Sequence, residues 1–391
     1  MANTTFLSAG WDETQDGSFY AGLNTGTGST ATYDSTQAHA GTGSLKCVVT
    51  QSGQYASPYT PDNTVADAGG CISAWFRFST VSPATLTNFL MMLTSGNGSG
   101  RMGLGLNTNG TINFAQRGAT QANGSTTLSA NTWYRISLSY TNASVSTWAA
   151  KVYINGTLEI NASAGVQGNA SSTGVVCVSF GQNSSSFGSF STPAVSTIWI
   201  DSMYIDNRTN LTDCGAIDVT AKRPFSNGTT NGFTTQIGAG GSGYGTGHAP
   251  QVNERPLSTT NGWSMVGAGS AVTEEYTLEG ASVGDVDISA ATIKDFMGWV
   301  DVKALIAETG SIIVGGVSSS ISVTTSAAIF TQAAGSATYP TGGTAIGVIT
   351  STTVTTFSLY ECGIVVAYTP AMNPVGKLLT VQQAMNRAGT Y

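Results

Sequence analysis

Residues able to do acid–base or metal chemistry are scarce in this chain of 391 residues. Histidine occurs only twice, as His39 and His248, and each stands in a turn rich in Gly or Ala with no nucleophile beside it. Turn or packing roles are therefore predicted for both. None of the five cysteines forms a Cys-x-x-Cys pair, so neither a zinc motif nor a redox motif is expected. Their odd number argues against a disulfide framework and favours free thiols packed as small hydrophobic side chains, most clearly Cys47 and Cys177.

Carboxylates are the second kind of chemistry that the sequence could support. Glycosidases need two acidic side chains flanking one sugar bond. No expected strand of the first half carries two carboxylates two or four residues apart beside a third, so no enzyme activity is predicted. Asp12, Glu13 and Asp201 could instead bind a structural calcium ion if the first and last strands of this half lie side by side, because Ca²⁺ takes about 6–8 oxygen ligands. The alternative is that these carboxylates cap and stabilise turns. No other cofactor is expected.

Aromatic rings are the third candidate group, since they can stack on sugar faces. The chain has seven tryptophans, most of which alternate with polar residues inside expected strands. Core packing is the prediction for those. Trp148 and Trp263 follow polar, turn-like segments, so the sequence favours these two for glycan contact at the surface.

The elements that must position these residues are almost all strands. Short runs rich in β-branched and aromatic residues alternate with Gly, Asn and Ser turns, and Asn109-Gly110 is a strong hairpin signal. The runs of the first half are residues 71–79, 88–93, 102–106, 111–114, 133–140, 151–158 and 197–205. This pattern predicts an antiparallel β-sandwich.

A second strand set follows a polar segment at residues 207–216. The fold class predicted is therefore all-β, with two consecutive antiparallel β-sandwich domains at residues 1–211 and 212–391. The second domain is expected to carry a long Gly-rich loop at 226–262. Apolar residues near helical spacing predict a short C-terminal helix at 375–388.

Composition excludes several functions. Only 9% of residues are charged, and 14 Lys and Arg stand against 21 Asp and Glu, a net charge of −7. A nucleic-acid partner would need a basic face, which is not expected here. The sequence contains no apolar run of about 18 residues, so no membrane-spanning helix is predicted. The first residues carry neither a basic nor an apolar signal region, so we expect synthesis in the cytoplasm without a signal peptide. Low charge also reduces repulsion between closely packed copies.

Several motifs stand in an order that resembles a known architecture. They are Trp11-Asp12-Glu13, Ala38 to Leu45, Trp75-Phe76-Arg77-Phe78, Asn131 to Ile136, Val152 to Gly156 and Ile198 to Asp206. Over roughly residues 1–210 this order resembles the concanavalin A-like (laminin G-like) jelly-roll domain of tailed-bacteriophage virion structural proteins. The second half is more loosely similar to the module that often follows that domain.

The resemblance implies a non-enzymatic virion protein, made in the host bacterial cytoplasm. Capsid decoration is the leading expectation, with the second domain docking and the lectin-like domain exposed. The alternative is a carbohydrate-binding tail or fibre adhesin that recognises the host surface. The expected partners are a major capsid or tail protein, further copies of the chain and a host surface glycan, but neither nucleic acid nor a membrane. Symmetric self-association as a dimer or trimer fits the same role.

Overall fold

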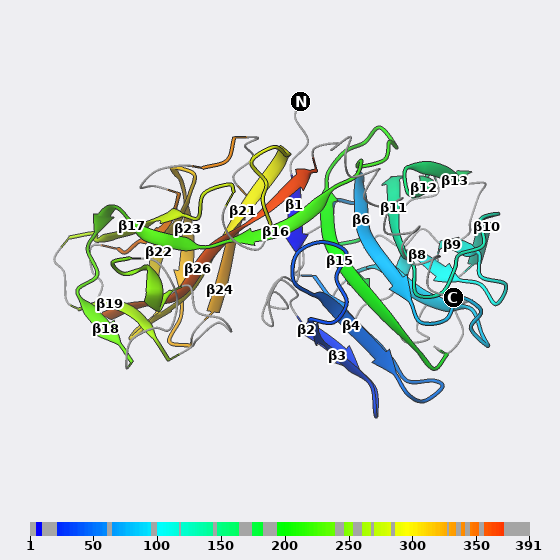
Figure 1. The fold of residues 1–391 in the computed structure, drawn as a ribbon, viewed down its shortest axis with the longest axis horizontal. Coiled ribbons are helices and arrows are strands. Elements are labelled where there is room, and N and C mark those ends of the chain that lie inside the picture. The colour runs from blue at the N-terminus through cyan, green and yellow to red at the C-terminus, as the bar shows by residue number, and fades with distance from the viewer. Residues whose placement is uncertain are drawn as a thin grey trace, which may run out of the picture.

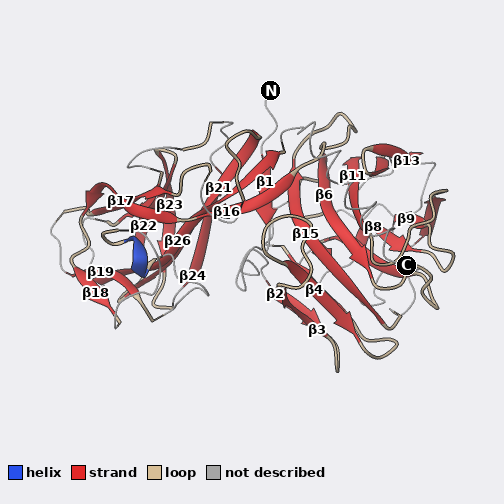
Figure 2. Ribbon diagram, in the orientation of Figure 1, coloured by secondary structure: helices blue, strands red, loops and turns tan. Residues whose placement is uncertain are grey.

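The computed structural model describes sixteen segments of the chain, and the statements below concern only these. They are residues 5–9, 22–60, 65–94, 100–116, 119–143, 147–163, 174–182, 194–238, 246–252, 260–266, 270–282, 286–326, 328–333, 338–340, 345–351 and 356–370. Within them the fold is almost entirely β, with one short 3-10 helix, η2 (Ala249–Gln251) (Figure 2). None of the described helices is long and apolar enough to cross a membrane.

The first half of the chain forms two antiparallel sheets, drawn in blue to green on the right of Figure 1. The eight-stranded sheet contains β1 (Thr5–Ala9), β3 (Thr30–Asp34), β4 (Ser44–Val49), β6 (Gly69–Phe78), β11 (Trp133–Thr141), β12 (Ala149–Ile154), β13 (Thr157–Ser163) and β15 (Ser196–Asp206). Its order is β13-β12-β11-β6-β15-β4-β3, and β1 also pairs with β15.

The seven-stranded sheet of this half contains β2 (Gly22–Thr25), β5 (Ala56–Tyr59), β7 (Thr87–Leu93), β8 (Gly100–Leu106), β9 (Ile112–Gln116), β10 (Ala119–Asn123) and β14 (Cys177–Phe180). Its order is β10-β9-β8-β7-β14-β5-β2. Alternation builds the core between the two sheets, since successive side chains of a strand point to opposite faces. In β6, Ile72, Phe76 and Phe78 are buried in this core, whereas Trp75 and Arg77 stand on the outer face.

The second half forms two further antiparallel sheets. One contains β16 (Asp218–Lys222), β18 (Thr235–Ile237), β19 (Gly262–Val266), β21 (Thr292–Ala304), β24 (Ala328–Ala333) and β26 (Thr356–Thr369), and the other β17 (Pro224–Asn231), β20 (Thr273–Leu278), β22 (Glu308–Val314), β23 (Val317–Val323) and β25 (Ile346–Ile349). Their orders are β18-β19-β26-β21-β24, with β16 paired to β26, and β17-β20-β25-β22-β23. The all-β, sandwich-like fold class predicted from the sequence is thus confirmed.

One local expectation for the second half was wrong, and a second concerns residues outside the described segments. The span 226–262 is not one long loop, because it contains most of β17, all of β18 and the helix η2. Its polar Thr and Asn residues form strands because β17 pairs with β20 and β18 pairs with β19. This stabilisation comes from partners distant in the sequence. The helix expected at 375–388 lies outside the described residues.

An apolar cluster joins the two halves. The core of the first sandwich continues through Cys214, Ile217 and Val219 to residues of β21 and β26. The residues that it reaches there are Met297, Trp299, Val365 and Ala367. Figure 1 shows β16 at this junction, where it leads from β15 into the second pair of sheets.

A disulfide also ties the connection between the halves to the first sandwich. Cys71 of β6 is bonded to Cys214, 143 residues further along the chain. The expectation of five free thiols was therefore wrong for this pair, whereas Cys47, Cys177 and Cys362 are free and buried as expected. The odd number of cysteines concealed the pair because only the folded chain brings these two side chains together.

Candidate functional site

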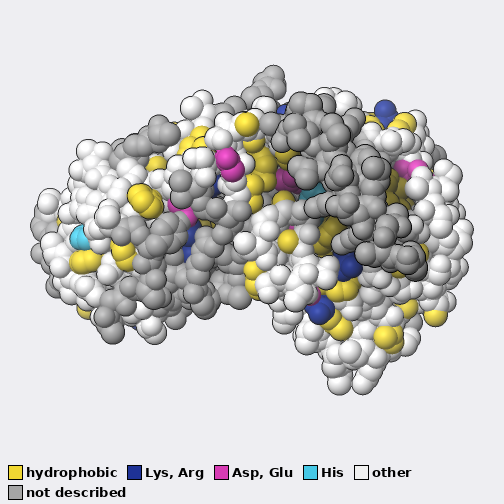
Figure 3. All heavy atoms as spheres, viewed as in Figure 1, with side chains coloured by type: hydrophobic (Ala, Val, Ile, Leu, Met, Phe, Trp, Pro, Cys, Tyr) yellow, Lys and Arg dark blue, Asp and Glu magenta, His cyan; other side chains and the backbone are white. Residues whose placement is uncertain are grey.

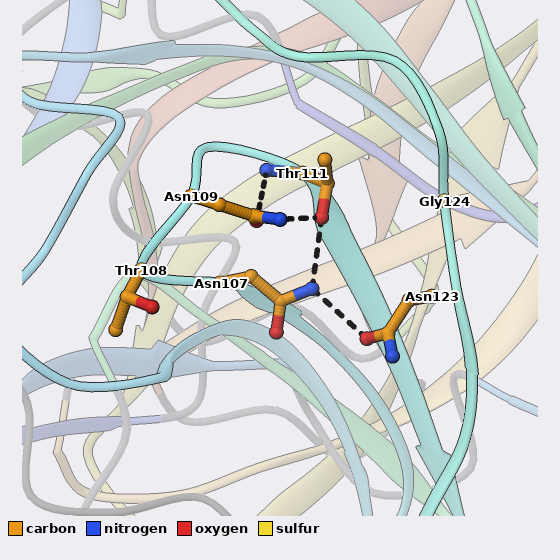
Figure 4. Close-up of a pocket in the computed structure, with 6 residues that line it drawn as sticks. All are labelled: Asn107, Thr108, Asn109, Thr111, Asn123 and Gly124. Atoms are coloured by element: carbon orange, nitrogen blue, oxygen red, sulfur yellow. Dashed lines mark hydrogen bonds between the residues drawn. The ribbon is translucent and has the colours of Figure 1, made fainter.

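A polar pocket of about 290 Å³ lies at one end of the seven-stranded sheet (Figure 4). The turn between β8 and β9 and the end of β10 supply its lining. The lining residues are Asn107, Thr108, Asn109, Thr111, Asn123 and Gly124. None of these side chains is charged or aromatic, so the pocket offers hydrogen bonds alone.

The hairpin turn is held by its own side chains. Asn109 Oδ1 accepts hydrogen bonds from the backbone N–H of Thr111 at 3.2 Å and from its hydroxyl at 2.9 Å. Such a contact two residues ahead is the turn that Asn favours. Gly110 has a φ of 83°, a left-handed conformation that glycine adopts without strain. The Asn-Gly hairpin predicted from the sequence is therefore present, and it fixes one wall of the pocket.

Amide groups form a network behind this wall. Asn107 Nδ2 donates to Thr111 Oγ1 and to Asn123 Oδ1, both at 2.9 Å. Asn113 Nδ2, from β9, donates to the same Asn123 oxygen at 2.9 Å. This orients the amides of Asn107 and Asn123 and leaves one polar atom of each, Oδ1 of Asn107 and Nδ2 of Asn123, outside the network. In Figure 4 these two atoms point to the same side.

An acceptor beside a donor suits a ligand rich in hydroxyl groups, because each hydroxyl both donates and accepts. Glu159 adds a charge near Gly124: its carboxylate accepts hydrogen bonds from the backbone and hydroxyl of Thr126, both at 2.7 Å, and from the backbone of Ser125. Burial acts to raise the pKa of Glu159, but these hydrogen bonds outweigh it and hold the pKa below its usual value. The ionised carboxylate disfavours an anionic ligand, so the pocket suits a neutral one.

The two tryptophans favoured for glycan contact do not meet, since they lie in different sandwiches. Trp148 is only 1% exposed and packs on Phe114, with ring centroids 5.5 Å apart. The expectation that it contacts glycan at the surface was wrong, because Trp148 directly precedes β12 and shares the parity of Ala150 and Val152, which face the core. Trp263 is half-buried, and His248 covers one face of its ring at 3.6 Å.

Other tryptophans occupy the surface instead. Trp75, Trp133 and Trp199 were expected in the core, yet all three are half-buried on the outer face of the eight-stranded sheet. A sequence signal for this exists: Arg77 follows Trp75 by two residues and therefore shares its face. The ring of Trp75 is covered by His39, stacked at 3.4 Å.

Asp201 does not fit a calcium ligand. Its side chain is fully buried, and its Oδ2 accepts hydrogen bonds from the backbone N–H groups of His39 at 2.7 Å and Ala40 at 3.1 Å. Its Oδ1 accepts a third from Ser202 at 2.7 Å. Both oxygens thus face amide hydrogens, which is the alternative role of stabilising a turn. Asp12 and Glu13 lie outside the described residues, and within the described part no group of three metal-ligating side chains occurs.

The second sandwich contains a histidine–carboxylate pair that sequence reasoning missed. His248 Nδ1 lies 2.7 Å from Oε1 of Glu274, a fully buried carboxylate whose other oxygen accepts the N–H of Phe233 at 2.9 Å. Burial raises the pKa of Glu274 above its usual value. No nucleophile is seen to contact His248 among the described residues, so the pair is a structural contact that holds the chain beside η2.

The two antiparallel sheets of the first half enclose one core, and part of this sandwich matches a known family. Residues 50–194 match the family model Laminin_G_3, described as the concanavalin A-like lectin/glucanases superfamily. The comparison with curated proteins found no match.

Several solved structures resemble part of this chain at low identity and with TM-scores below 0.5. The cellulose induced protein Cip1 is 18% identical with a TM-score of 0.41, over 54% of this chain and all of that one. An endo-β-1,4-glucuronan lyase from the fungus Trichoderma reesei is 14% identical with a TM-score of 0.42, over 54% of this chain and 98% of that one. A carbohydrate esterase from Shiga toxin-encoding bacteriophage phi24B is 16% identical with a TM-score of 0.36, over 53% of this chain and all of that one.

Proposed function

We propose that this protein is a non-enzymatic virion structural protein whose first sandwich binds a neutral glycan. The observation that carries the glycan-binding part is the pair of free polar atoms in the pocket, Asn107 Oδ1 and Asn123 Nδ2, held side by side by a shared hydrogen-bond network. A preorganised acceptor and donor lose little entropy when they bind two hydroxyl groups of one sugar.

A binding role is favoured over catalysis because the described carboxylates near the core of the first sandwich are already engaged. Asp34, Asp201, Asp206 and Asp213 accept hydrogen bonds from side chains or backbone N–H groups, and Asp206 and Asp213 pair with arginines. Acid catalysis of glycoside cleavage needs a carboxyl group free to transfer a proton to the sugar.

The role in the virion rests on the order of the sequence motifs and on the composition. We propose capsid decoration, in which the second sandwich docks on the particle and the lectin-like sandwich faces outwards. The apolar junction supports this arrangement, since a second sandwich that shares a core with the first can hold it in a defined orientation. The partners would be a major capsid or tail protein and further copies of the chain.

A tail or fibre adhesin is the second candidate, and the pocket itself favours it. A neutral-glycan site has a direct use in recognising a bacterial surface. Electron microscopy of purified particles labelled with an antibody to this chain would separate the two roles. Label on the head supports decoration, label on the tail supports the adhesin, and a chain that is missing from the particles overturns both.

The pocket is tested with a glycan array probed with the full chain and its variants. Wild type is expected to bind neutral glycans, and Asn123→Ala to bind about tenfold more weakly, because one oriented hydrogen-bonding group is worth about 1.4 kcal/mol. Asn161→Ala is the matched control, since Asn161 is an exposed asparagine on β13, outside the pocket lining, and it should bind as wild type does. Absence of any hit, or hits that Asn107→Ala and Asn123→Ala both leave unchanged, contradicts the proposal.

A further inference from the structure

We infer that the outer face of the eight-stranded sheet is a second binding surface, one that takes an acidic polysaccharide. It goes beyond the neutral-glycan pocket, which lies on the other sheet. Its residues are Trp133, Arg77, Trp199 and Lys46, here called the tryptophan–cation row.

The register of the sheet places these four side chains in one line. Trp133 of β11 is opposite Arg77 of β6, Arg77 is opposite Trp199 of β15, and Trp199 is opposite Lys46 of β4. Directly paired residues of antiparallel strands point to the same face. Neighbouring strands lie about 4.8 Å apart, so the row is about 14 Å long. All four side chains are half-buried, and their outer parts therefore reach the solvent.

The ring of Trp199 lies between two cations, one on each neighbouring strand. The guanidinium carbon of Arg77 lies 4.8 Å from the centroid of the Trp199 ring, and Lys46 Nζ lies 5.8 Å from it. Cations at these distances are attracted by the ring face. Arg77 Nε also donates to the carbonyl oxygen of Asn131 at 3.1 Å, which fixes the direction of the guanidinium. Trp199 is therefore a positioning residue, and the cations are the groups that would contact a ligand.

The charges along the row do not cancel. Asp34 Oδ2 accepts a hydrogen bond from Trp199 Nε1 at 2.8 Å and lies 3.3 Å from Lys46 Nζ, so it compensates Lys46. Arg77 has no carboxylate partner among the contacts of the described residues. A chain with a net charge of −7 thus keeps one oriented, uncompensated guanidinium between two tryptophans.

These features select the class of ligand. A guanidinium forms paired hydrogen bonds with a carboxylate or a sulfate group. The Trp133 ring, one strand away, offers a surface for a sugar face. Figure 3 shows Lys or Arg side chains beside hydrophobic ones over the strands β15 and β4. A nucleic acid would need many more cations, because it carries a charge on every phosphate. The His39 ring contacts Trp133 at 6.1 Å between centroids, and the rest of the half-buried Trp133 ring can take one sugar face. A polymer in which sugar rings alternate with single acid groups matches one guanidinium beside one such ring.

The test measures binding of the full chain to two acidic polymers, polygalacturonate and hyaluronate, by calorimetry at low salt. We expect both to bind, and Arg77→Ala to weaken binding about tenfold through loss of a charge-assisted hydrogen bond. Raising the salt concentration should also weaken it, since the row is exposed to solvent. Arg77→Lys should keep part of the affinity, because it keeps the charge but loses the paired geometry.

Matched variants separate the row from general charge. Lys151→Ala removes a half-buried cation from β12 of the same sheet, outside the row, and should change nothing. Trp133→Ala should weaken both polymers. Failure of both polymers to bind, or equal losses for Arg77→Ala and Lys151→Ala, overturns the inference. Stronger binding of oligothymidylate than of either polymer overturns it in favour of a nucleic acid.

The two sites fail independently. Asn123→Ala should leave binding of the acidic polymers intact, and Arg77→Ala should leave array binding of neutral glycans intact. Loss of both kinds of binding in both variants would instead indicate misfolding, which the circular dichroism spectrum of each variant checks.

Discussion

Trp148 and Trp199 show how the same residue type takes opposite roles in one sandwich. Trp148 is fully buried on Phe114, and its indole N–H has no hydrogen-bond partner among the described residues. Trp199 uses its N–H to bind Asp34 and its ring to hold two cations. The parity of Trp148 relative to the adjoining strand β12, and of Trp199 within β15, decides which role results.

Replacing Trp148 by Ala should lower the free energy of unfolding by about 3–5 kcal/mol, because a large cavity is left in the core. Trp148→Phe should cost less than about half of that, since a ring remains and a buried, unpartnered N–H is removed. Urea unfolding of the two variants gives the comparison. Equal losses of unfolding free energy in Trp148→Phe and Trp148→Ala would show that removing the unpartnered indole N–H brings no gain in stability.

The ion pair between Arg135 and Asp213 makes stability depend on pH. Arg135 Nη2 lies 2.7 Å from Asp213 Oδ2, and both side chains are largely buried. Burial acts to raise the pKa of Asp213, but hydrogen bonds from Arg135 and its charge outweigh this and lower the pKa. A lowered pKa in the folded state stabilises above the unfolded pKa of about 3.9, and this stability is lost as the pH falls through the folded value.

Asp213→Asn should therefore cost about 2–3 kcal/mol at pH 7, because it leaves a buried guanidinium without its counter-charge. The difference from wild type should shrink as the pH falls below about 4, because the carboxyl of the unfolded wild-type chain is protonated there, and it should vanish once the pH passes the lower folded pKa. Unfolding by urea at pH 3 to 7 measures this. The control is Asp287→Asn on an exposed loop, which removes a carboxylate that has no buried cation beside it and should cost far less at pH 7 than Asp213→Asn. A penalty for Asp213→Asn that is constant with pH would contradict the assignment.

At the scale of the elements, the link between β15 and β16 is held by covalent and polar contacts. The disulfide attaches Cys214 to β6, and Arg208 binds the carbonyl oxygen of Asp213 at 2.8 Å and the carboxylate of Asp206. A segment without any strand is thereby fastened to the sheet that precedes it. Its polar sequence pattern alone would have allowed a free linker.

Removing this disulfide should lower stability by about 2–4 kcal/mol, since it closes a long loop of the unfolded chain. The comparison is thermal unfolding of wild type and Cys214→Ser, each with and without reducing agent. Reducing agent should lower the Tm of wild type towards that of the variant and leave the variant unchanged. A wild type that is insensitive to reducing agent, with the same Tm as Cys214→Ser, would show that the bond is not formed in solution.

At the scale of the whole molecule, the junction joins the two sandwiches by three kinds of contact. The apolar cluster crosses it, Ser202 Oγ accepts the backbone N–H of Val219 at 3.1 Å, and His39 Nδ1 lies 3.3 Å from Asp218 Oδ1. Burial of this apolar surface favours unfolding of both halves as one unit.

Met297→Ala should weaken the junction, since Met297 belongs to the cluster that both sandwiches share. The expected results are a loss of about 2–5 kcal/mol and faster protease cleavage between residues 207 and 217. Ile312→Ala is the control: Ile312 is buried in the separate core of the second sandwich, and its loss should destabilise without exposing the link. A wild type that melts in two independent calorimetric transitions would contradict a coupled junction.

The sequence by itself determined the local features of this protein. Alternation of apolar and polar residues predicted most strands of the first half, and Asn109-Gly110 predicted its hairpin, because both signals act between near neighbours. Composition likewise excluded a basic face. The strands within 226–262 were missed because their stability comes from pairing partners far along the chain.

Which side chains meet depends on the folded arrangement of the sheets. The Cys71–Cys214 bond, the amides of Asn107 and Asn123 and the line from Trp133 to Lys46 all join residues of separate elements. The physical reason is that strand order and register, which the long-range packing of the sheets selects, set these distances. Local residue preferences do not determine these distances.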